Sequence, residues 1–456
     1  MAQRAPPLVT RHIPAPSPIF NLSAAARHAA GKPLSAVGGL AKADRQSTIL
    51  MPIYLDHNAT TPVASAVREA MEPFFQTQWG NPSSLHRFGS SLRRHLESAR
   101  ASVAHLIGAD PIEIVFTGCG TESNNLAIRG AWEAAATPRG AIVTSRVEHP
   151  SVREVCRVLG TAAPARARGA RPSLDEREGE GGVTRRRLEQ SSDAPADLIE
   201  IGVDAAGHLD LPSLQAALAR RPILVSLMWA NNETGVLFPI ADIARLVKAA
   251  GALLHVDAVQ AAGKIPIDLR TVPVDLLSLS GHKLNAPKGI GALFVRRGTR
   301  IQPQILGGGQ EQGLRGGTPN VPYIAGFGAA CELARSRLPD MARVRALRDR
   351  LEQGLLAQCP EAIVNGDPTQ RLPNTLNIRF PGMEGESLLL RLDDAGIAIS
   401  TGSACSSGKQ EPSHVLLAMG LSMRDANSAL RFSLGDDNTE AEIDHAIAQT
   451  AAIVRR

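Results

Sequence analysis

Short apolar runs alternate with amphipathic stretches through most of residues 51–456. The runs EIVFTG, GAIVTSR, ILVSLMWA, ALLHVDAV and VDLLSLSG are each about 4–8 residues, rich in Val, Ile and Leu, as is typical of buried strands. Amphipathic segments such as IADIARLVKAAG separate them and predict helices, and this one ends at Gly251 as a helix C-terminus should. The alternation predicts an α/β fold with a mostly parallel sheet covered by helices on both faces.

Two segments interrupt this pattern. Residues 1–50 are rich in Ala, Pro and Arg and contain one acid, Asp44. They are either a transit peptide or a stretch before the true start at Met51, and the second interpretation is preferred. Residues 161–197 carry many charges of both signs and few apolar side chains. Such segments bury too little surface to offset their ordering entropy, so we expect no packed structure in 1–50 and a disordered surface insertion at 161–197.

Composition narrows the class of protein. At 456 residues two domains are expected, and 43% hydrophobic with 20% charged residues describes a globular protein. A net charge of +5 and 3% aromatic residues argue against dedicated nucleic-acid binding. No apolar run is long enough to cross a bilayer, and the five scattered cysteines lack metal-site spacing. We therefore expect a cytoplasmic protein with no membrane or nucleic-acid partner and no resident metal.

In parallel sheets, ligands bind beyond the C-terminal ends of the strands. After EIVFTG, Gly120 and Thr121 lie at the start of a predicted helix, where free N–H groups suit a phosphate. A simple helix cap would explain the same residues. After ALLHV come Asp257 and Gln260, and this acid could cap a helix or hold a proton on a cofactor ring. His149 also follows a strand, although a lone histidine is more often structural.

After VDLLSLS come Ser280, His282 and Lys283. Desolvation at the mouth of a sheet would lower the pKa of this lysine and make it a nucleophilic amine suited to a Schiff base. For a lone SGHK, a surface lysine in a turn would be the better explanation. Together, however, an anion site, a carboxylate and a buried amine meet the three needs of pyridoxal phosphate.

One thiol, Cys405, lies in the small, polar run STGSACSSG. Structural cysteines sit among apolar neighbours, whereas this composition is typical of a mobile, solvated loop. The thiol is either incidental or placed to be reached.

At this point the chain resembles the cysteine desulfurases of the NifS/IscS type, which are fold-type I pyridoxal-phosphate enzymes of the class V aminotransferase family. The resemblance covers about 51–160 and 198–450 and rests on ten motifs in family order: YLDHNATTP (54–62), GNPSS (80–84), FTGCGTESNN (116–125), EHPSV (148–152), NNETG (231–235), HVDAVQ (255–260), SGHK (280–283), RGGTPN (315–320), GSACSSG (402–408) and RFSLG (431–435).

The resemblance implies a large cofactor-binding domain at 64–340 and a smaller α+β domain made of 51–63 and 341–456, with a seven-stranded type of sheet in the first. It also implies that Lys283 binds the cofactor covalently, with Asp257 on the ring nitrogen and His149 over the ring. The remaining cofactor contacts would come from Asn232 and Gln260 at the phenolic oxygen and from Gly120, Thr121, Ser280, His282 and a neighbouring subunit's Thr318 at the phosphate.

For the substrate, L-cysteine, the resemblance implies that Arg431 and Asn81 hold the carboxylate and that Cys405 attacks the sulfur. Lys283 would remove the α proton, and the products would be L-alanine and a persulfide on Cys405, which could also serve as a transient iron–sulfur ligand. The polar loop fits a thiol that must swing to an acceptor. A homodimer and a sulfur-acceptor protein, such as an iron–sulfur scaffold or a sulfur carrier, are implied partners. A selenocysteine lyase or another carbon–sulfur lyase of the class is the alternative.

Overall fold

The computed structural model describes residues 52–135, 140–161, 197–401 and 411–455. The leader 1–50, nearly all of the 161–197 insertion and the Cys405 segment lie outside these residues, so the structure gives no outcome for the predictions made on them. Among the helices of the described residues, none combines the length and the apolar character that a membrane crossing requires.

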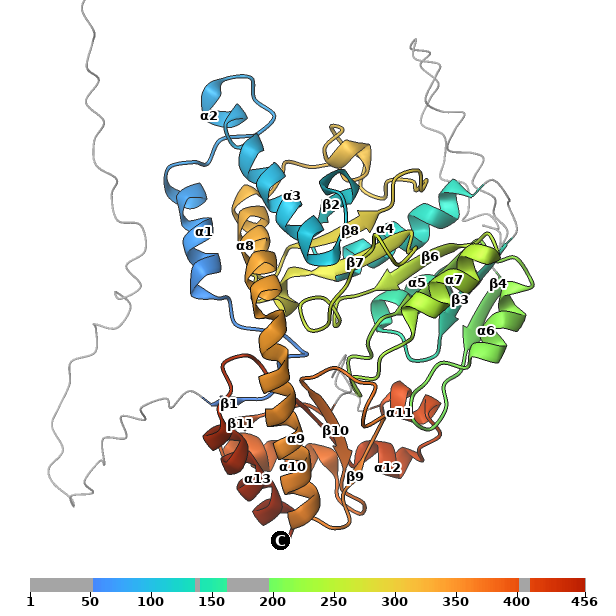
Figure 1. The fold of residues 1–456 in the computed structure, drawn as a ribbon, viewed down its shortest axis with the longest axis vertical. Coiled ribbons are helices and arrows are strands. Elements are labelled where there is room, and N and C mark those ends of the chain that lie inside the picture. The colour runs from blue at the N-terminus through green and yellow to red at the C-terminus, as the bar shows by residue number, and fades with distance from the viewer. Residues whose placement is uncertain (1–51, 136–139, 162–196, 402–410, 456) are drawn as a thin grey trace, which may run out of the picture. The chain divides into compact units, whose positions relative to one another are not determined.

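A seven-stranded sheet is the centre of the fold (Figure 1), with the strand order β2-β8-β7-β6-β5-β3-β4. The predicted apolar runs form β2 (Ile114–Thr117), β3 (Ala141–Ser145), β5 (Leu224–Met228), β6 (Leu253–Asp257) and β7 (Leu276–Ser280). The pairs β4–β3, β3–β5, β5–β6 and β6–β7 are all parallel, with β4 at Asp197–Ile201. Strand β8 (Gly291–Val295) runs antiparallel to its two neighbours, β2 and β7. The predicted mostly parallel sheet is confirmed.

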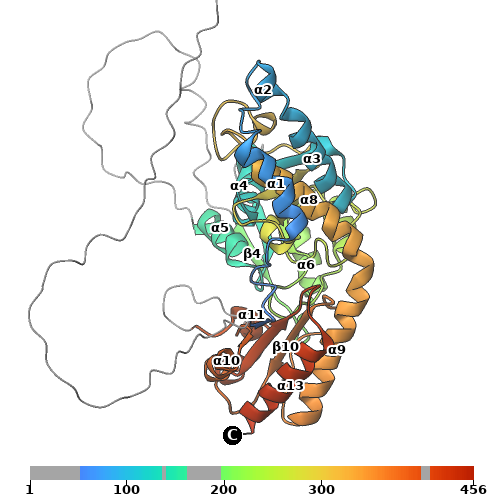
Figure 2. The same ribbon diagram turned by 90° about the vertical axis from the view of Figure 1, so that its left-hand side faces the viewer.

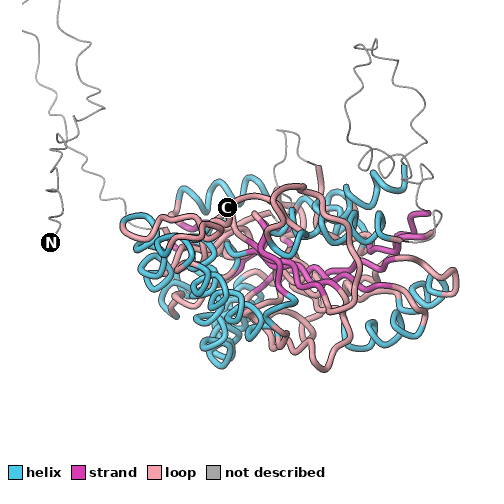
Figure 3. Tube along the Cα trace, turned by 90° about the horizontal axis from the view of Figure 1, so that it is seen from above, coloured by secondary structure: helices cyan, strands magenta, loops and turns pink. Residues whose placement is uncertain are grey.

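Helices cover both faces of this sheet, as Figure 3 shows from above. On one face, α4 (Gly120–Ala134) and α5 (Pro150–Thr161) pack over alternate strand residues such as Val115, Ile142 and Leu224. On the other face lie α1 (Ser65–Gln76), α3 (Arg93–Ile107), α6 (Leu211–Leu218), α7 (Ile240–Ala249) and α8 (Val321–Arg337). The predicted helix over 240–251 ends as expected, because Gly251 has a φ of +73°.

A second hydrophobic core surrounds a three-stranded antiparallel sheet. Its strands are β9 (Ile363–Val364), β10 (Thr375–Arg379) and β12 (Ala429–Ser433), and β1 (Ile53–Tyr54) pairs in parallel with β11 (Ile397–Ala398) nearby. Three helices complete this core: α9 (Met341–Gln358), α10 (Gly385–Asp394) and α13 (Glu440–Val454). Figure 2 shows α9 continuing the course of α8 toward this smaller sheet.

Three short helices complete the fold. They are α2 (Arg87–Ser90), α11 (His414–Ala418) and α12 (Met423–Asn427). The sequence-based division into domains at residues 63–64 and 340–341 stays a prediction.

Candidate active site

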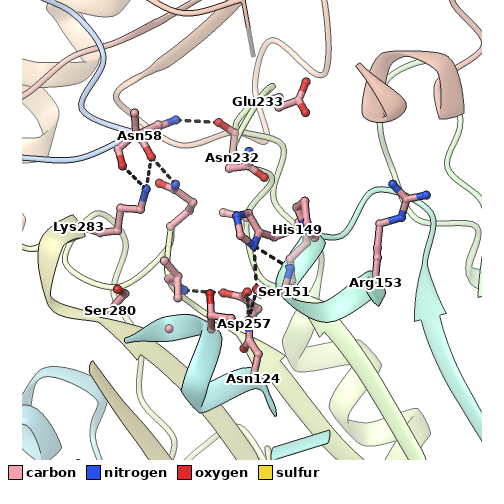
Figure 4. A pocket seen from close by; sticks show the side chains of 18 of the residues that line it. Asn58, Asn124, His149, Ser151, Arg153, Asn232, Glu233, Asp257, Ser280 and Lys283 are labelled. Carbon is pink, nitrogen blue, oxygen red and sulfur yellow. Dashed lines mark hydrogen bonds between the residues drawn. The ribbon is translucent and has the colours of Figure 1, made fainter. Parts of the chain in front are cut away.

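A cavity of about 910 Å³ opens at the C-terminal ends of the parallel strands. It is lined from both sheets, by residues that follow β2, β3, β5, β6 and β7 and by Arg431 of β12. The sequence-predicted residues that line it are Gly120, Thr121, His149, Asn232, Asp257, Gln260, Ser280, His282, Lys283 and Arg431. The fold therefore brings these candidates together in one place (Figure 4).

The amine of Lys283 lies just after β7 and points toward the segment that follows β1. It donates hydrogen bonds to the backbone carbonyls of Asn58 and Ala59, the latter at 2.7 Å. Burial, and then the positive charge of Arg431, lowers the pKa of Lys283 to about 8. An appreciable fraction of this amine is therefore neutral near physiological pH, as a nucleophile or base requires.

Asp257 ends β6 and is buried. Its Oδ2 accepts from Asn124 Nδ2 at 2.8 Å and its Oδ1 accepts from the backbone N–H of Val259 at 3.0 Å. Both contacts leave the carboxylate facing the cavity, where it can hold a cationic N–H of a ligand.

His149 is linked to this carboxylate through a short chain of side chains (Figure 4). The second N–H of Asn124 donates to Ser151 Oγ at 2.8 Å, and that hydroxyl lies 2.7 Å from His149 Nδ1. The Ser151 backbone N–H also donates to Nδ1, at 3.2 Å. The pKa of His149 is lowered overall. Burial is the largest cause and the charge of Lys283 adds to it, whereas the charge of Asp257 acts in the opposite direction. The imidazole is then neutral with its proton on Nε2, because Nδ1 acts as the acceptor.

Arg431 is buried beneath the cavity. Its Nη2 contacts Asp56 Oδ1 at 2.5 Å and its Nη1 donates to the Asn232 carbonyl at 3.1 Å. Its buried Nε has no hydrogen-bond partner within the described part of the chain. The guanidinium is thus fixed in place and keeps donor capacity for an anion.

Two of the described residues predicted for the site do not line this cavity. Asn81 and Thr318 are exposed on other loops, and neither lines it. The position of Cys405 lies outside the described residues, although Ser400 on one side and Glu411 on the other both line the cavity.

Several side chains at the site received no individual role from the sequence. They are Asp56, Asn58, Asn124, Glu148, Ser151 and Lys264. Most lie inside the quoted motifs, which is the signal that could have found them, but Lys264 lies outside every motif.

Comparisons with known proteins agree with this geometry. Residues 53–172 and 186–445 match the class-V aminotransferase family. Cysteine desulfurase 2 of Trichormus variabilis is 48% identical over 404 residues, covering 89% of this chain and 93% of the relative. Cysteine desulfurase NifS of Azotobacter vinelandii is 46% identical over 404 residues, covering 88% and 92%.

Solved structures give the same result. A NifS-like protein, 36% identical, superposes with a TM-score of 0.77 and covers 89% of this chain and 100% of its own. The NifS-like protein of Rickettsia africae, 31% identical, gives a TM-score of 0.73 with 89% and 100% covered. The chain belongs to the class-V aminotransferase family and, within it, to the cysteine desulfurases.

Proposed function

We propose that this protein removes sulfur from L-cysteine with the help of pyridoxal phosphate, giving L-alanine and a persulfide on Cys405. The observation that carries the proposal is the convergence of Lys283, Asp257, His149 and Arg431 on one cavity at the strand ends. The identity of 46–48% to cysteine desulfurases over most of the chain selects this reaction within the class.

The residues at the end of β2 and β7 fit the phosphate of the cofactor. The buried hydroxyl of Ser280 has no hydrogen-bond partner among the described residues, and it faces the start of the 15-residue helix α4. A side chain at Gly120 would lie 3.0 Å from Val259 Cγ2 and 3.2 Å from Ser280 Cβ, so glycine keeps this cradle open. Free N–H groups of the helix start, Thr121, Ser280 and His282 would hold the phosphate there.

The other cofactor contacts follow from the same cavity. Lys283 would bind the aldehyde carbon, Asp257 would hold the protonated ring nitrogen, and Asn232 and Gln260 would face the ring oxygen. When bound, pyridoxal phosphate supplies an electron sink for the charge left at Cα of the substrate.

The chain's own groups would manage the protons. The Lys283 amine, with its pKa lowered to about 8, accepts the α proton of cysteine. Asn124 and Val259 fix the orientation of the Asp257 carboxylate, so that it can accept the N–H of the protonated ring nitrogen. His149 carries a proton on Nε2 because Ser151 occupies Nδ1, so it can donate toward the cavity. Arg431 lines the cavity and would hold the substrate carboxylate with N–H groups that Asp56 and Asn232 leave free.

A homodimer would complete the site. Thr318, expected to act from a neighbouring subunit, and Asn81, expected to hold the substrate carboxylate, are both exposed and lie outside the cavity of their own chain, and we propose that both act across the interface. Large apolar side chains flank both: Trp79, Leu85 and Phe88 near Asn81, and Leu306 before the Thr318 loop, are 71%, 94%, 44% and 78% exposed. Contiguous exposed apolar side chains mark interaction surfaces, and the rings of Trp79 and Phe88 are in contact, with their centroids 5.0 Å apart.

Sulfur on Cys405 would then pass to an acceptor protein, such as an iron–sulfur scaffold or a sulfur carrier. The alternative, a lyase that releases sulfur without a persulfide, does not need this thiol. The two functions therefore differ in what they require of Cys405.

The deciding experiment compares wild type, Cys405→Ala and Cys119→Ala, each loaded with pyridoxal phosphate and given L-cysteine and a thiol reductant. Cys119 is the matched control because it is a second cysteine that lines the same cavity. Alanine and sulfide should appear in equal amounts from wild type and Cys119→Ala, and neither should appear from Cys405→Ala. Continued production by Cys405→Ala would replace the persulfide mechanism by the lyase reaction.

A further inference from the structure

Behind the amine of Lys283, Asn58 uses every polar atom it has (Figure 4). Its backbone N–H donates to Ser433 Oγ at 2.9 Å, and its side-chain NH₂ donates to Thr375 Oγ1 at 2.9 Å and to the Asn232 carbonyl at 3.2 Å. Asn58 is only 1% exposed. It therefore joins the strand ends of the large sheet to β10 and β12 of the small sheet.

Lys264 is bonded to the acceptor side of this cluster. Its Nζ donates to Asn58 Oδ1 at 3.2 Å and to Gln260 Oε1 at 2.8 Å. Asn374 Nδ2 also donates to Asn58 Oδ1, at 3.1 Å. In turn, the carbonyl oxygen of Asn58 accepts from Gln260 Nε2 at 2.9 Å and from Lys283 Nζ.

A lysine in this place fixes the direction of the hydrogen bonds. An amide can be turned over to exchange its oxygen and its NH₂, but the protonated amine of a lysine has only N–H groups to offer. With Gln260 Oε1 held by Lys264, the NH₂ of Gln260 must face the Asn58 carbonyl and the cavity. An N–H donor, and not an oxygen, is then presented to a ligand.

We propose that Lys264 is a positioning residue that sets the orientation of Gln260 and Asn58, so that Gln260 gives an N–H to the cofactor's ring oxygen while Asn58 holds the Lys283 amine. This inference rests on the proposed function, because it assigns a role toward the cofactor of that site. Lys264 itself does not line the large cavity.

The charged groups around Lys264 do not undo this role. Lys283, Arg431, Asp436 and His57 are its titratable neighbours, and a small cavity of about 50 Å³ lies among most of them. Burial, and then Lys283 and Arg431, lower the pKa of Lys264 to about 7, whereas Asp436 raises it. A neutral amine gains a lone pair but still has two N–H groups for its two acceptors, and the Asn58 carbonyl can only accept, so the same hydrogen bonds are available on both sides of neutral pH.

The test measures the pH midpoint at which the visible absorbance of the bound cofactor changes, for wild type, Lys264→Met, Lys264→Arg and Lys248→Met. The N–H at the ring oxygen and a nearby positive charge both favour the deprotonated form of the bound cofactor. Their loss in Lys264→Met should therefore raise the midpoint by about one pH unit. Lys264→Arg, which has only donors, should restore most of the wild-type value. Lys248 lies in the last turn of α7, near the end of β6 that is opposite the cavity, and its variant should leave the midpoint unchanged.

A double-mutant comparison separates positioning from simple loss of charge. If Lys264 acts through Gln260, Lys264→Met should shift the midpoint by less than half as much in a Gln260→Leu background. An equal shift in both backgrounds, or a Lys264→Arg value matching Lys264→Met, would overturn the proposal.

Two controls keep the result interpretable. If thermal unfolding shows that Lys264→Met does not fold, Lys264→Gln takes its place, because its amide can turn and should also raise the midpoint. A wild type that binds no pyridoxal phosphate and forms no alanine from cysteine overturns the proposed function itself. A working wild type with Lys264→Met equal to Lys248→Met overturns only the role of Lys264.

Discussion

At the two ends of the seven-stranded sheet, charged side chains of the same kinds have different surroundings. At the end opposite the cavity, Asp275 precedes β7 and its Oδ2 accepts from the Leu254 backbone N–H at 2.8 Å. Arg296 follows the antiparallel strand β8 and donates to three backbone carbonyls nearby. At the other end, Asp257 and Lys283 face the cavity and contact other side chains or the chain segment after β1.

The two ends of the sheet differ in whether their buried polar atoms have hydrogen-bond partners. Within the described residues, eight buried side-chain atoms have no hydrogen-bond partner, and four of them belong to residues that line the cavity: Asn124 Oδ1, Arg153 Nε, Ser280 Oγ and Arg431 Nε. Unpaired buried polar atoms cost about 1–3 kcal/mol each. Their gathering in one cavity indicates a site that a polar ligand completes, whereas the opposite end is already complete.

The largest expected effect comes from Lys283→Ala. On the proposed function, removing the amine would remove both the covalent attachment of the cofactor and the base, so kcat should fall by about 10⁴-fold or more. Steady-state alanine formation and the visible cofactor absorbance measure the two losses. Lys288→Ala, an exposed lysine five residues on, should keep both. Retention of either signal by Lys283→Ala would remove this lysine from the site.

Asp257→Asn and Asp275→Asn test the two ends of the sheet directly. An asparagine at 257 cannot hold a ring proton, so kcat/KM should fall by about 10²-fold or more while the thermal midpoint changes little. Asparagine at 275 weakens a buried bond to the backbone, so it should lower stability by about 1 kcal/mol and leave kcat/KM near wild type. The reverse pattern would contradict the assignment of the functional end.

Glu148 gives a third test, through pH. It is fully buried; Ser145 Oγ and the Met228 backbone N–H bond to its Oε1 at 2.6 and 3.0 Å. Burial raises the pKa of Glu148 to about 8, against the bonds from Ser145 and Met228. The folded state then holds a proton that the unfolded chain releases above its ordinary pKa, so this group's contribution to stability falls as pH rises from about 4.5 to about 8.

Glu148→Gln should flatten that part of the stability curve. Relative to wild type, the variant should gain about 1 kcal/mol or more between pH 5 and pH 8. Urea unfolding at a series of pH values measures the gain, with the exposed Glu361→Gln as control. Parallel curves for wild type and Glu148→Gln would show that Glu148 is ionised in the folded state.

The sequence predicted the central strands and most of the residues at their ends, because continuous apolar runs specify buried strands and the chemistry follows them directly. It singled out Asp257, which ends its strand, and gave no role to Asp275, which precedes the next one, because ligands of parallel sheets bind beyond the C-terminal strand ends. It did not predict that β8 is antiparallel, which sends Arg296 away from the cavity. The sequence assigned no role to Lys264, because its partners Asn58 and Gln260 are far apart in the chain and are brought together only by the fold.

His208 provides the smallest effect and the sharpest form of the comparison. It lies after β4, at the cavity end of the sheet, yet both ring nitrogens are paired: Nδ1 with Asp204 at 3.1 Å and Nε2 with Asp367 at 2.8 Å. Burial lowers the pKa of His208, but the bonds to Asp367 and Asp204 outweigh it and raise the pKa. Because both ring nitrogens of His208 are paired, we expect it to have a structural role although it lies at the cavity end of the sheet.

The sign of the pH dependence follows from the raised pKa. The stabilisation is fully present below the ordinary histidine value of about 6.5 and is lost as pH rises through the folded-state pKa. Because the ring is partly exposed, His208→Gln should cost no more than about 1 kcal/mol at pH 6 and less at pH 9, with kcat/KM unchanged. Urea unfolding and alanine formation at both pH values measure this. A loss of activity without a loss of stability would mean that His208 takes part in the reaction. Its place at the cavity end of the sheet, and not its bonds to Asp204 and Asp367, would then decide its role.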